Sequence, residues 1–224
     1  LLYAGTAETA QDGALLLMYG CYWNPGPYRD LYAWDARTGE ARTVLKMSAV
    51  EAQHGEWLQK EFAGKPASNI IPVLSPDLQR LIFNQAAGNG GDNYMAKGAS
   101  QRQGIVCFEL ESERLKWFRA KWGHPGWHPD SRGIFEVGNL LFDTDHPEAP
   151  PGRLKDVPNL RGSHPAVSPD GKLMVTDGMT EAVGGQPTEC GIMVADMSGG
   201  KWVLLHSFVQ SKGAQSWRRN DPHP

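Results

Sequence analysis

The chain reads His164-Pro165-Ala166-Val167-Ser168-Pro169-Asp170-Gly171, and the same phrase occurs earlier in altered form. One copy reads His124-Pro125-Gly126-Trp127-His128-Pro129-Asp130, and a more degenerate copy reads Ile71-Pro72-Val73-Leu74-Ser75-Pro76-Asp77. The chain ends on His223-Pro224, the first two letters of the phrase. Copies at intervals of about 40 to 60 residues predict a repeat architecture.

Each copy opens a unit of similar pattern. A short apolar run follows the Ser-Pro-Asp turn, at 81–83, 133–137 and 173–176. Three other runs end in an acidic residue before a tight turn and a further apolar run, at 31–35, 105–109 and 192–196. Short runs separated by turn residues at fixed offsets are typical of antiparallel strands. Four strands per unit predict the blade of a β-propeller.

We therefore expect an all-β chain, a β-propeller of four-stranded antiparallel blades. It would carry about four blades and the start of a fifth, in a single domain that continues in a longer protein of six or seven blades. The expected blades cover 1–48, 66–120, 121–160, 161–212 and, as a start only, 213–224. A β-sandwich is the other architecture with short strands, but it does not require the phrase to recur.

The composition narrows the range of partners. The chain has 224 residues, 40% hydrophobic and 21% charged, as in an ordinary globular protein. Its net charge of -3 offers no basic surface for a nucleic acid, and no apolar run reaches the roughly 18 residues of a membrane span. The three cysteines lack zinc-type spacing, and Cys107, within an apolar run, is expected to be a buried thiol. The cellular compartment is left open.

The propeller topology separates two faces of the molecule. The first residue of the phrase lies beside the central channel at one face, and the turn lies at the other, where His128 replaces the serine and is expected to be structural. The long loops all fall on the histidine face, at 20–29, 46–69, 84–103, 178–190 and 210–222. Such loops commonly form binding sites. One contains a capping box, Ser48-Ala49-Val50-Glu51, that predicts a short helix through Phe62.

Three histidines hold the first position of the phrase. His124, His164 and His223 come from successive blades and are expected to converge at the channel mouth, with rings within ~8 Å of one another. Ile71 and Thr6 hold this position in the earlier blades, so part of the rim carries no ligand. Imidazole is a common metal ligand, and an open coordination position suits a catalytic metal. In the alternative, each histidine hydrogen-bonds within its own blade and only fixes a turn.

The phrase His-Pro-x-x-Ser-Pro-Asp-Gly before a strand resembles the WD40-like (PD40) repeat of TolB-type propellers, and the likeness covers nearly the whole chain. The His-Pro copies and the closing Asp221-Pro222-His223-Pro224 are most similar to oligogalacturonate-lyase-like propellers. This resemblance implies a divalent metal, typically manganese, held by three histidines and a glutamine. The matching residues are His124, His164, His223 and Gln215. Gln215 lies further from His223 than the lyase pattern implies, and Asp221 is an alternative oxygen ligand or a hydrogen-bond acceptor that orients an imidazole.

The resemblance also implies a polysaccharide lyase that performs β-elimination on oligogalacturonate or a related uronate oligosaccharide. That reaction needs a cation at the uronate carboxylate, a base for the C5 proton and help for the departing oxygen. Arg161 and Arg219 are the candidates for assisting the base step. Arg218 is a candidate for bidentate carboxylate binding, and Trp217 for stacking on a sugar ring.

Two further candidates follow equivalent strands. Asn84 and Asp177 occupy aligned positions at the histidine face. Both side chains suit sugar hydroxyls, and both equally suit capping of the loop backbone.

A second function stays open beside the lyase. A non-catalytic TolB-like propeller would bind a protein or peptide on its loop face. Such a module does not require the imidazoles to converge, and it predicts exposed apolar and aromatic side chains instead.

Overall fold

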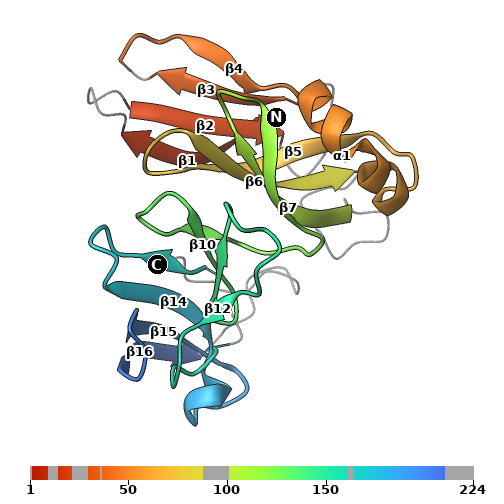
Figure 1. Cartoon of the computed structure of the whole chain (residues 1–224). Helices are drawn as coiled ribbons and strands as arrows, with labels where there is room; N and C mark the ends of the chain where they lie inside the picture. Colours follow the sequence, from red (N-terminus) through yellow and green to blue (C-terminus); the bar gives the residue numbers. More distant parts are fainter. Residues whose placement is uncertain are drawn as a thin grey trace. The chain divides into compact units, whose positions relative to one another are not determined.

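The computed structural model describes residues 2–9, 15–21, 30–35, 37–87, 101–160 and 164–209, the first two ranges as backbone only. The chain forms two compact units, Leu1–Trp122 and Gly123–Pro224. Each unit contains two four-stranded antiparallel sheets whose strands are neighbours in chain order (Figure 1). This arrangement is the up-and-down blade of a β-propeller, as the recurring phrase predicts.

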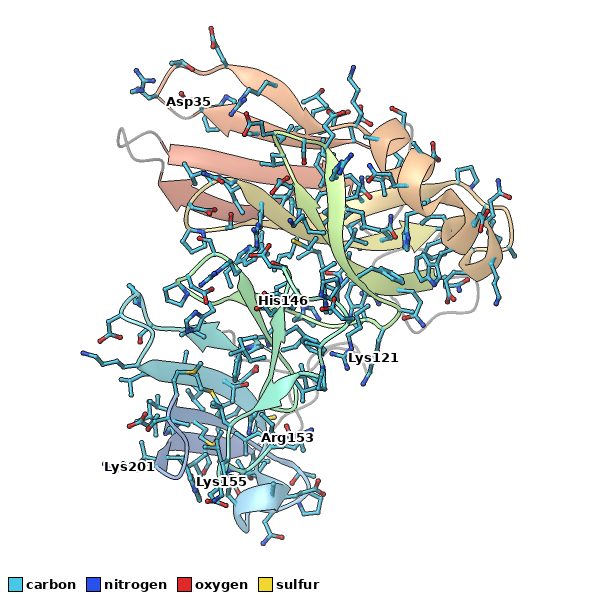
Figure 2. The ribbon with its side chains drawn as sticks, viewed as in Figure 1. Asp35, Lys121, His146, Arg153, Lys155 and Lys201 are labelled. Carbon is cyan, nitrogen blue, oxygen red and sulfur yellow. The ribbon has the colours of Figure 1, made fainter. Side chains whose placement is uncertain are left out.

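The first sheet of unit 1 has the order β1-β2-β3-β4. Its strands are β1 (Leu2–Thr9), β2 (Leu15–Cys21), β3 (Leu31–Asp35) and β4 (Ala41–Leu45). Asp35 ends β3 at the turn into β4 (Figure 2), and its Oδ1 accepts a 2.8 Å hydrogen bond from the backbone N–H of Arg37. The acid predicted at the end of this run therefore shapes the hairpin turn.

The second sheet of unit 1 has the order β5-β6-β7-β8. Its strands are β5 (Ala67–Leu74), β6 (Arg80–Ala87), β7 (Gln101–Glu109) and β8 (Arg114–Arg119). The register of β5 and β6 shifts between Ile70 and Val73, and Ile71 has a φ of 52°. A β-branched residue rarely adopts this left-handed backbone. The inner strand therefore continues through the first position of the phrase only by way of a bulge.

A single α-helix, α1 (Met47–Glu61), links the two sheets of unit 1. Its buried residues are Met47, Val50, His54 and Leu58, the spacing of one helical face. The expected capping box at Ser48 is wrong, because the helix begins earlier and its N-cap, Lys46, makes no side-chain cap. Asp30 supplies the cap from a distance: its Oδ1 accepts a 2.7 Å hydrogen bond from the N–H of Met47.

Helix α1 lies against β5 and β8 (Figure 1). The Gln53 side chain donates to the carbonyl of Glu113 at 2.7 Å and accepts the N–H of Leu115 at 3.0 Å, at the turn between β7 and β8. The Trp57 ring meets the Phe118 ring with centroids 4.7 Å apart. These contacts cover the outer edge of the second sheet, an edge that would otherwise expose unpaired backbone groups.

One hydrophobic core joins both sheets of unit 1 and α1. It consists of Leu31, Ala33, Leu45, Met47, Val50, Leu58, Phe62, Ala67, Leu74, Leu81, Phe83, Ala87, Val106 and Phe108. Cys107 is a fully buried thiol, as expected. Among the described residues, no helix is long and apolar enough to cross a membrane.

Unit 2 contains the third and fourth sheets, with orders β9-β10-β11-β12 and β13-β14-β15-β16. The third has β9 (Gly126–Trp127), β10 (Gly133–Glu136), β11 (Leu140–Asp143) and β12 (Gly152–Arg153). The fourth has β13 (Ala166–Val167), β14 (Leu173–Met179), β15 (Glu189–Asp196) and β16 (Trp202–Val209). A short 3-10 helix, η1 (Thr180–Val183), leads from β14 to β15.

The two sheets of unit 2 pack through a second core. Phe135, Leu160, Met174, Met193 and Ala195 form it. The inner strands also approach closely. A Cβ added to Gly126 in β9 would collide with the carbonyl oxygen of Pro165. Only glycine permits this approach of the two backbones.

The turn of the phrase has the same hydrogen bonds in three blades. The N–H of its first turn residue donates to the carbonyl five positions on: Ser75 to Arg80, His128 to Gly133 and Ser168 to Leu173, each at 2.8 Å. The residue three positions on has a positive φ in each copy: Leu78 at 64°, Ser131 at 61° and Gly171 at 70°. The phrase is therefore one structural motif, used at the same point of three sheets.

Candidate functional site

The site is built on the first residues of two copies of the phrase. His124 precedes β9 and His164 precedes β13, and their ring centroids lie 4.7 Å apart with an interplanar angle of 63°. This separation agrees with the expected ~8 Å limit for a shared site. The close approach of Gly126 to Pro165 brings the two histidine-bearing segments together.

His164 is held by Asp177 at two points. The backbone N–H of His164 donates to Asp177 Oδ1 at 2.9 Å, and its ring Nδ1 lies 2.9 Å from Asp177 Oδ2. The carboxylate side chain is 1% exposed and the imidazole 13% exposed. Both contacts lie within one blade. They match the alternative in which a histidine hydrogen-bonds within its own blade.

Strand register places Asp177 opposite His164. Ala166 pairs with Val175 between β13 and β14, so two positions outward His164 meets Asp177. Asn84 has the equivalent place in β6, but Ile71 holds the histidine's position in that copy, and the bulge leaves Asn84 opposite Ile70. The Asn84 Nδ2 instead donates to the carbonyl of Gly104 at 2.8 Å, and the side chain is 1% exposed. Both side chains thus support local structure, which is the backbone-capping alternative for these two residues.

Glu136 lies beside this site, although the sequence pattern did not single it out. It ends β10, directly before Val137, and is 2% exposed. It lines a small cavity together with Pro165 and Thr176, the neighbours in sequence of His164 and Asp177. A carboxylate buried within an otherwise apolar strand is uncommon, and the run Ile134-Phe135-Glu136-Val137 carries that signal in the sequence.

His128 belongs to a turn, where it was expected. Its Nδ1 lies 3.1 Å from Asp130 Oδ2, and Asp130 Oδ1 accepts the N–H of Gly133 at 2.8 Å. Burial alone would raise the pKa of Asp130, but hydrogen bonds from the backbone N–H groups of Gly133 and Arg132, together with the interaction with His128, lower it below its ordinary value. His128 thus takes the place that Ser75 and Ser168 have in the other copies.

The remaining predicted site residues lie outside the described part of the chain. They are Arg161, Gln215, Trp217, Arg218, Arg219, Asp221 and His223. Among the described residues, no group of three or more histidine, cysteine or acidic side chains is arranged to hold a metal ion. The described residues therefore supply two imidazoles, and any further ligand would come from elsewhere.

The His124 and His164 pair fits a metal in one respect. Two imidazoles bound to one metal, with metal–nitrogen distances of about 2.0–2.1 Å, place their ring centroids roughly 4.5 to 5.5 Å apart. The observed 4.7 Å falls in that range. Asp177 directs both carboxylate oxygens to His164, so it is placed to orient a ligand rather than to serve as one.

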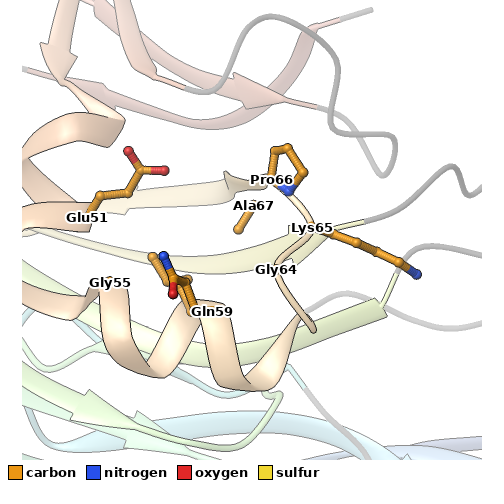
Figure 3. A pocket seen from close by; sticks show the side chains of 8 residues that line it. Glu51, Gly55, Gln59, Gly64, Lys65, Pro66 and Ala67 are labelled. Carbon is orange, nitrogen blue, oxygen red and sulfur yellow. The ribbon is translucent and has the colours of Figure 1, made fainter.

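A separate hollow of about 400 Å³ lies beside α1 in unit 1 (Figure 3). Its wall combines one side of the helix with the segment that leads into β5, and includes Glu51, Gln59 and Lys65. Its lining contains one acid and one base and no histidine or cysteine. These side chains do not form a metal site of the kind that His124 and His164 suggest.

Solved structures with the same fold come from several classes of protein. An oligogalacturonate lyase in complex with manganese matches with a TM-score of 0.50 and 15% identity, over 90% of this chain and 52% of that one. A putative TolB from Agrobacterium tumefaciens matches with a TM-score of 0.50 and 17% identity, over 92% of this chain and 68% of that one. Prolyl oligopeptidase B from Galerina marginata matches with a TM-score of 0.53 and 13% identity, over 94% and 32%.

The fold is that of a β-propeller. At these identities the similarity shows the fold alone, because propellers carry many unrelated functions. No family model matches the sequence, and no curated protein matches it. The chain spans about half of the lyase and about a third of the peptidase, so the activities of those whole proteins come to this chain only as proposals.

Proposed function

We propose that this propeller is a metal-dependent, carbohydrate-active protein, a lyase that performs β-elimination on oligogalacturonate or a related uronate oligosaccharide. The observation that carries the proposal is the pair of imidazoles from successive blades, His124 and His164, with ring centroids 4.7 Å apart. A purely structural histidine does not require a second histidine beside it. Two imidazoles at the start of neighbouring inner strands are the beginning of a nitrogen-rich metal site.

In this proposal His124 and His164 hold a divalent cation, with manganese the first choice, and His223 and Gln215 are the proposed further ligands. When bound, the cation supplies positive charge that neutralises the uronate carboxylate and makes the C5 proton more acidic. Asp177 keeps His164 in place through its two hydrogen bonds. Glu136, buried in the same unit, is an additional acidic group close to the site.

The proposed roles of the remaining residues follow from their chemistry. Arg218 would bind the uronate carboxylate through its planar, two-pronged guanidinium, and Trp217 would stack on a sugar ring. Arg161 and Arg219 would assist removal of the C5 proton. Each of these four residues lies close in sequence to a proposed ligand, Arg161 before His164 and the others before His223.

A non-catalytic propeller that binds a protein or peptide is the second candidate. The TolB structure matches this chain with the same TM-score as the lyase, 0.50, so the fold favours neither function. The two candidates differ in what the paired imidazoles do. The lyase requires them to bind a metal, whereas the binding module leaves the loop face as the working surface.

The test uses the full-length protein and its His164→Ala variant. We expect the unaltered protein to bind Mn²⁺ in calorimetry and to cleave oligogalacturonate with formation of an unsaturated uronate, and we expect His164→Ala to do neither. His128→Ser is the matched control, because His128 lies in a turn where the other copies carry serine. Cleavage that survives in His164→Ala would end the lyase proposal, and peptide binding without Mn²⁺ binding would favour the second candidate.

A further inference from the structure

The Asp177–His164 contact determines more than the position of a side chain. We propose that Asp177 is a positioning residue that holds His164 as the tautomer protonated on Nδ1, with the ring lone pair on Nε2. The tautomer itself follows from the contact, and its use in binding a divalent cation rests on the proposed function. Neither the recurring phrase nor the resemblance assigned this role to Asp177, which they placed among the sugar-binding candidates.

The chemistry of the two groups decides where the hydrogen lies. An ionised carboxylate only accepts hydrogen bonds, so the 2.9 Å contact between Nδ1 and Asp177 Oδ2 requires the hydrogen on Nδ1. In a neutral imidazole the second nitrogen then carries the lone pair. A metal or another electrophile that His164 binds must therefore approach Nε2.

The second hydrogen bond fixes the carboxylate itself. Asp177 Oδ1 accepts the backbone N–H of His164 at 2.9 Å, so the carboxylate cannot turn from the ring without losing this bond as well. Asp177 is 1% exposed, which leaves little access for water to compete with either contact. Two bonds from one residue to one carboxylate make the ring orientation a property of the folded blade.

The position of Asp177 in the sheet makes this support rigid. Asp177 belongs to β14, a strand that pairs with β13 through Met174 and Val175 on one side, and with β15 on the other side, where Asp177 faces Ile192. A carboxylate on a strand held along both sides is displaced less easily than one on a loop. The ring of His124 lies beside the ring thus oriented, with 4.7 Å between the centroids.

Such a carboxylate–imidazole pair has a defined effect on a metal ligand. The carboxylate selects the tautomer and makes the opposite nitrogen a better donor, and loss of such a partner typically lowers metal affinity by about 10- to 100-fold. The ligand class for Nε2 is accordingly a divalent cation that accepts imidazole nitrogen, such as Mn²⁺ or Zn²⁺.

The experiment reads the tautomer directly, without any metal. The ring nitrogens of His164 are assigned by ¹⁵N NMR in the metal-free, full-length protein at about pH 8, where histidine is ordinarily neutral. We expect the Nδ1–H tautomer. In Asp177→Asn the side-chain carbonyl can still accept the backbone N–H while its NH₂ faces the ring, so we expect the hydrogen to move to Nε2 and Mn²⁺ affinity to fall about 10- to 100-fold.

The control is Asp196→Asn, a change in the same sheet at the turn between β15 and β16, where the carboxylate accepts a 2.8 Å bond from Ser198. This variant should keep the His164 tautomer of the unaltered protein. An Nε2–H tautomer or a doubly protonated ring in the unaltered protein would overturn the inference, whether or not Asp177→Asn folds. An Nδ1–H ring in a protein that fails to bind Mn²⁺ would support the inference and refute the proposed function.

Discussion

Ser75 Oγ donates a 2.6 Å hydrogen bond to Asp77 Oδ1 and accepts a 2.8 Å bond from the N–H of Arg80, which joins both ends of a turn. Ser168 repeats this arrangement, with 2.6 Å to Asp170 and 3.0 Å from Leu173. A serine hydroxyl that both donates and accepts is the element of the phrase that closes the turn. The two copies differ chiefly in burial, because the Ser75 side chain is fully buried.

That difference yields a first prediction. Ser75→Ala should lower the free energy of unfolding by about 1–2 kcal/mol, because both bonds are lost and the polar groups left behind are shielded from water. Ser168→Ala should cost less, since water can replace the hydroxyl at the more exposed turn. Urea denaturation of both variants measures the effects. Equal losses would show that burial of Ser75 contributes nothing to the turn.

The environment of His54 predicts pH-dependent stability in unit 1. His54 stacks on Trp57 with centroids 4.8 Å apart, and it meets the ring of Phe118 edge-on at 4.1 Å. Its Nε2 is buried without a hydrogen-bond partner in the described structure, and burial lowers the pKa of His54 below its ordinary value of 6.5. The folded state therefore favours the neutral ring.

The direction of this pH dependence follows from the linkage between folding and protonation of His54. Below its ordinary pKa of 6.5 the unfolded chain takes up a proton at His54 that the folded protein resists until the pH reaches the lowered value. The stabilisation that neutral His54 gives the folded protein is complete above pH 6.5. It declines as the pH falls from 6.5 to the lowered pKa of His54 in the folded state. The protection factors of the α1 amides, which correct hydrogen exchange for the intrinsic effect of pH on its rate, should fall at lower pH, and His54→Phe should flatten this dependence. His146→Gln, a change at an exposed imidazole, should leave the α1 profile unaltered.

Gly104 is a site where a side chain would disturb the contact between α1 and the second sheet. Its φ is +75°, and an added Cβ would lie 3.1 Å from Trp57 Cη2 and 3.3 Å from Phe118 Cε2. Gly104→Ala should cost about 1–3 kcal/mol of unfolding free energy through backbone strain and crowding. Gly39→Ala is the matched control, with the same φ and open space around it. If Gly104→Ala lowers the stability measured by thermal unfolding no more than Gly39→Ala does, Trp57 moves aside without an energetic penalty.

Gly126→Ala tests whether close approach of the inner strands builds the histidine pair. The new Cβ would collide with the carbonyl oxygen of Pro165, so β9 and β13 must separate. We expect a loss of about 1–3 kcal/mol, typical of overpacking, and weaker Mn²⁺ binding in calorimetry. Gly152→Ala adds a Cβ at ordinary contact distance, 3.7 Å from Leu141, and should change neither quantity. Unchanged Mn²⁺ binding in Gly126→Ala would separate the metal site from this packing.

The start of α1 shows where local pattern and tertiary structure diverge. The capping box at Ser48 predicted the helix but misplaced its first turn. The cap at Met47 comes from Asp30, which precedes β3 and β4 in the chain. A partner that distant in sequence leaves no local pattern. Phe62, the predicted end of the helix, is the C-cap and is fully buried, because the end depends on the apolar spacing of the helix itself.

Asp177 and Asn84 show how far alignment of repeats carries. Their equivalent positions in the second strand of two blades were readable from the phrase, but the register differs between the blades. Asp177 lies opposite His164, the first residue of its copy, whereas the bulge in β5 places Asn84 opposite Ile70, one residue before its copy begins. What each side chain does depends on that opposite residue. His164 offers Asp177 two donors, whereas the side chain of Ile70 has no polar atom, and Asn84 Nδ2 donates to the carbonyl of Gly104 instead.

The sequence alone determined the blades of this protein. The turn of each blade is closed by hydrogen bonds within five residues, such as those between Ser75, Asp77 and Arg80. Contacts between residues so close in the chain depend on the local sequence. The aligned copies predicted that His124 and His164 converge, but only the tertiary structure decided how closely their rings approach, and that Asp177 holds one of them. Those contacts depend on the packing of Gly126 against Pro165 and on strand register, and packing between blades leaves no signature in a single repeat.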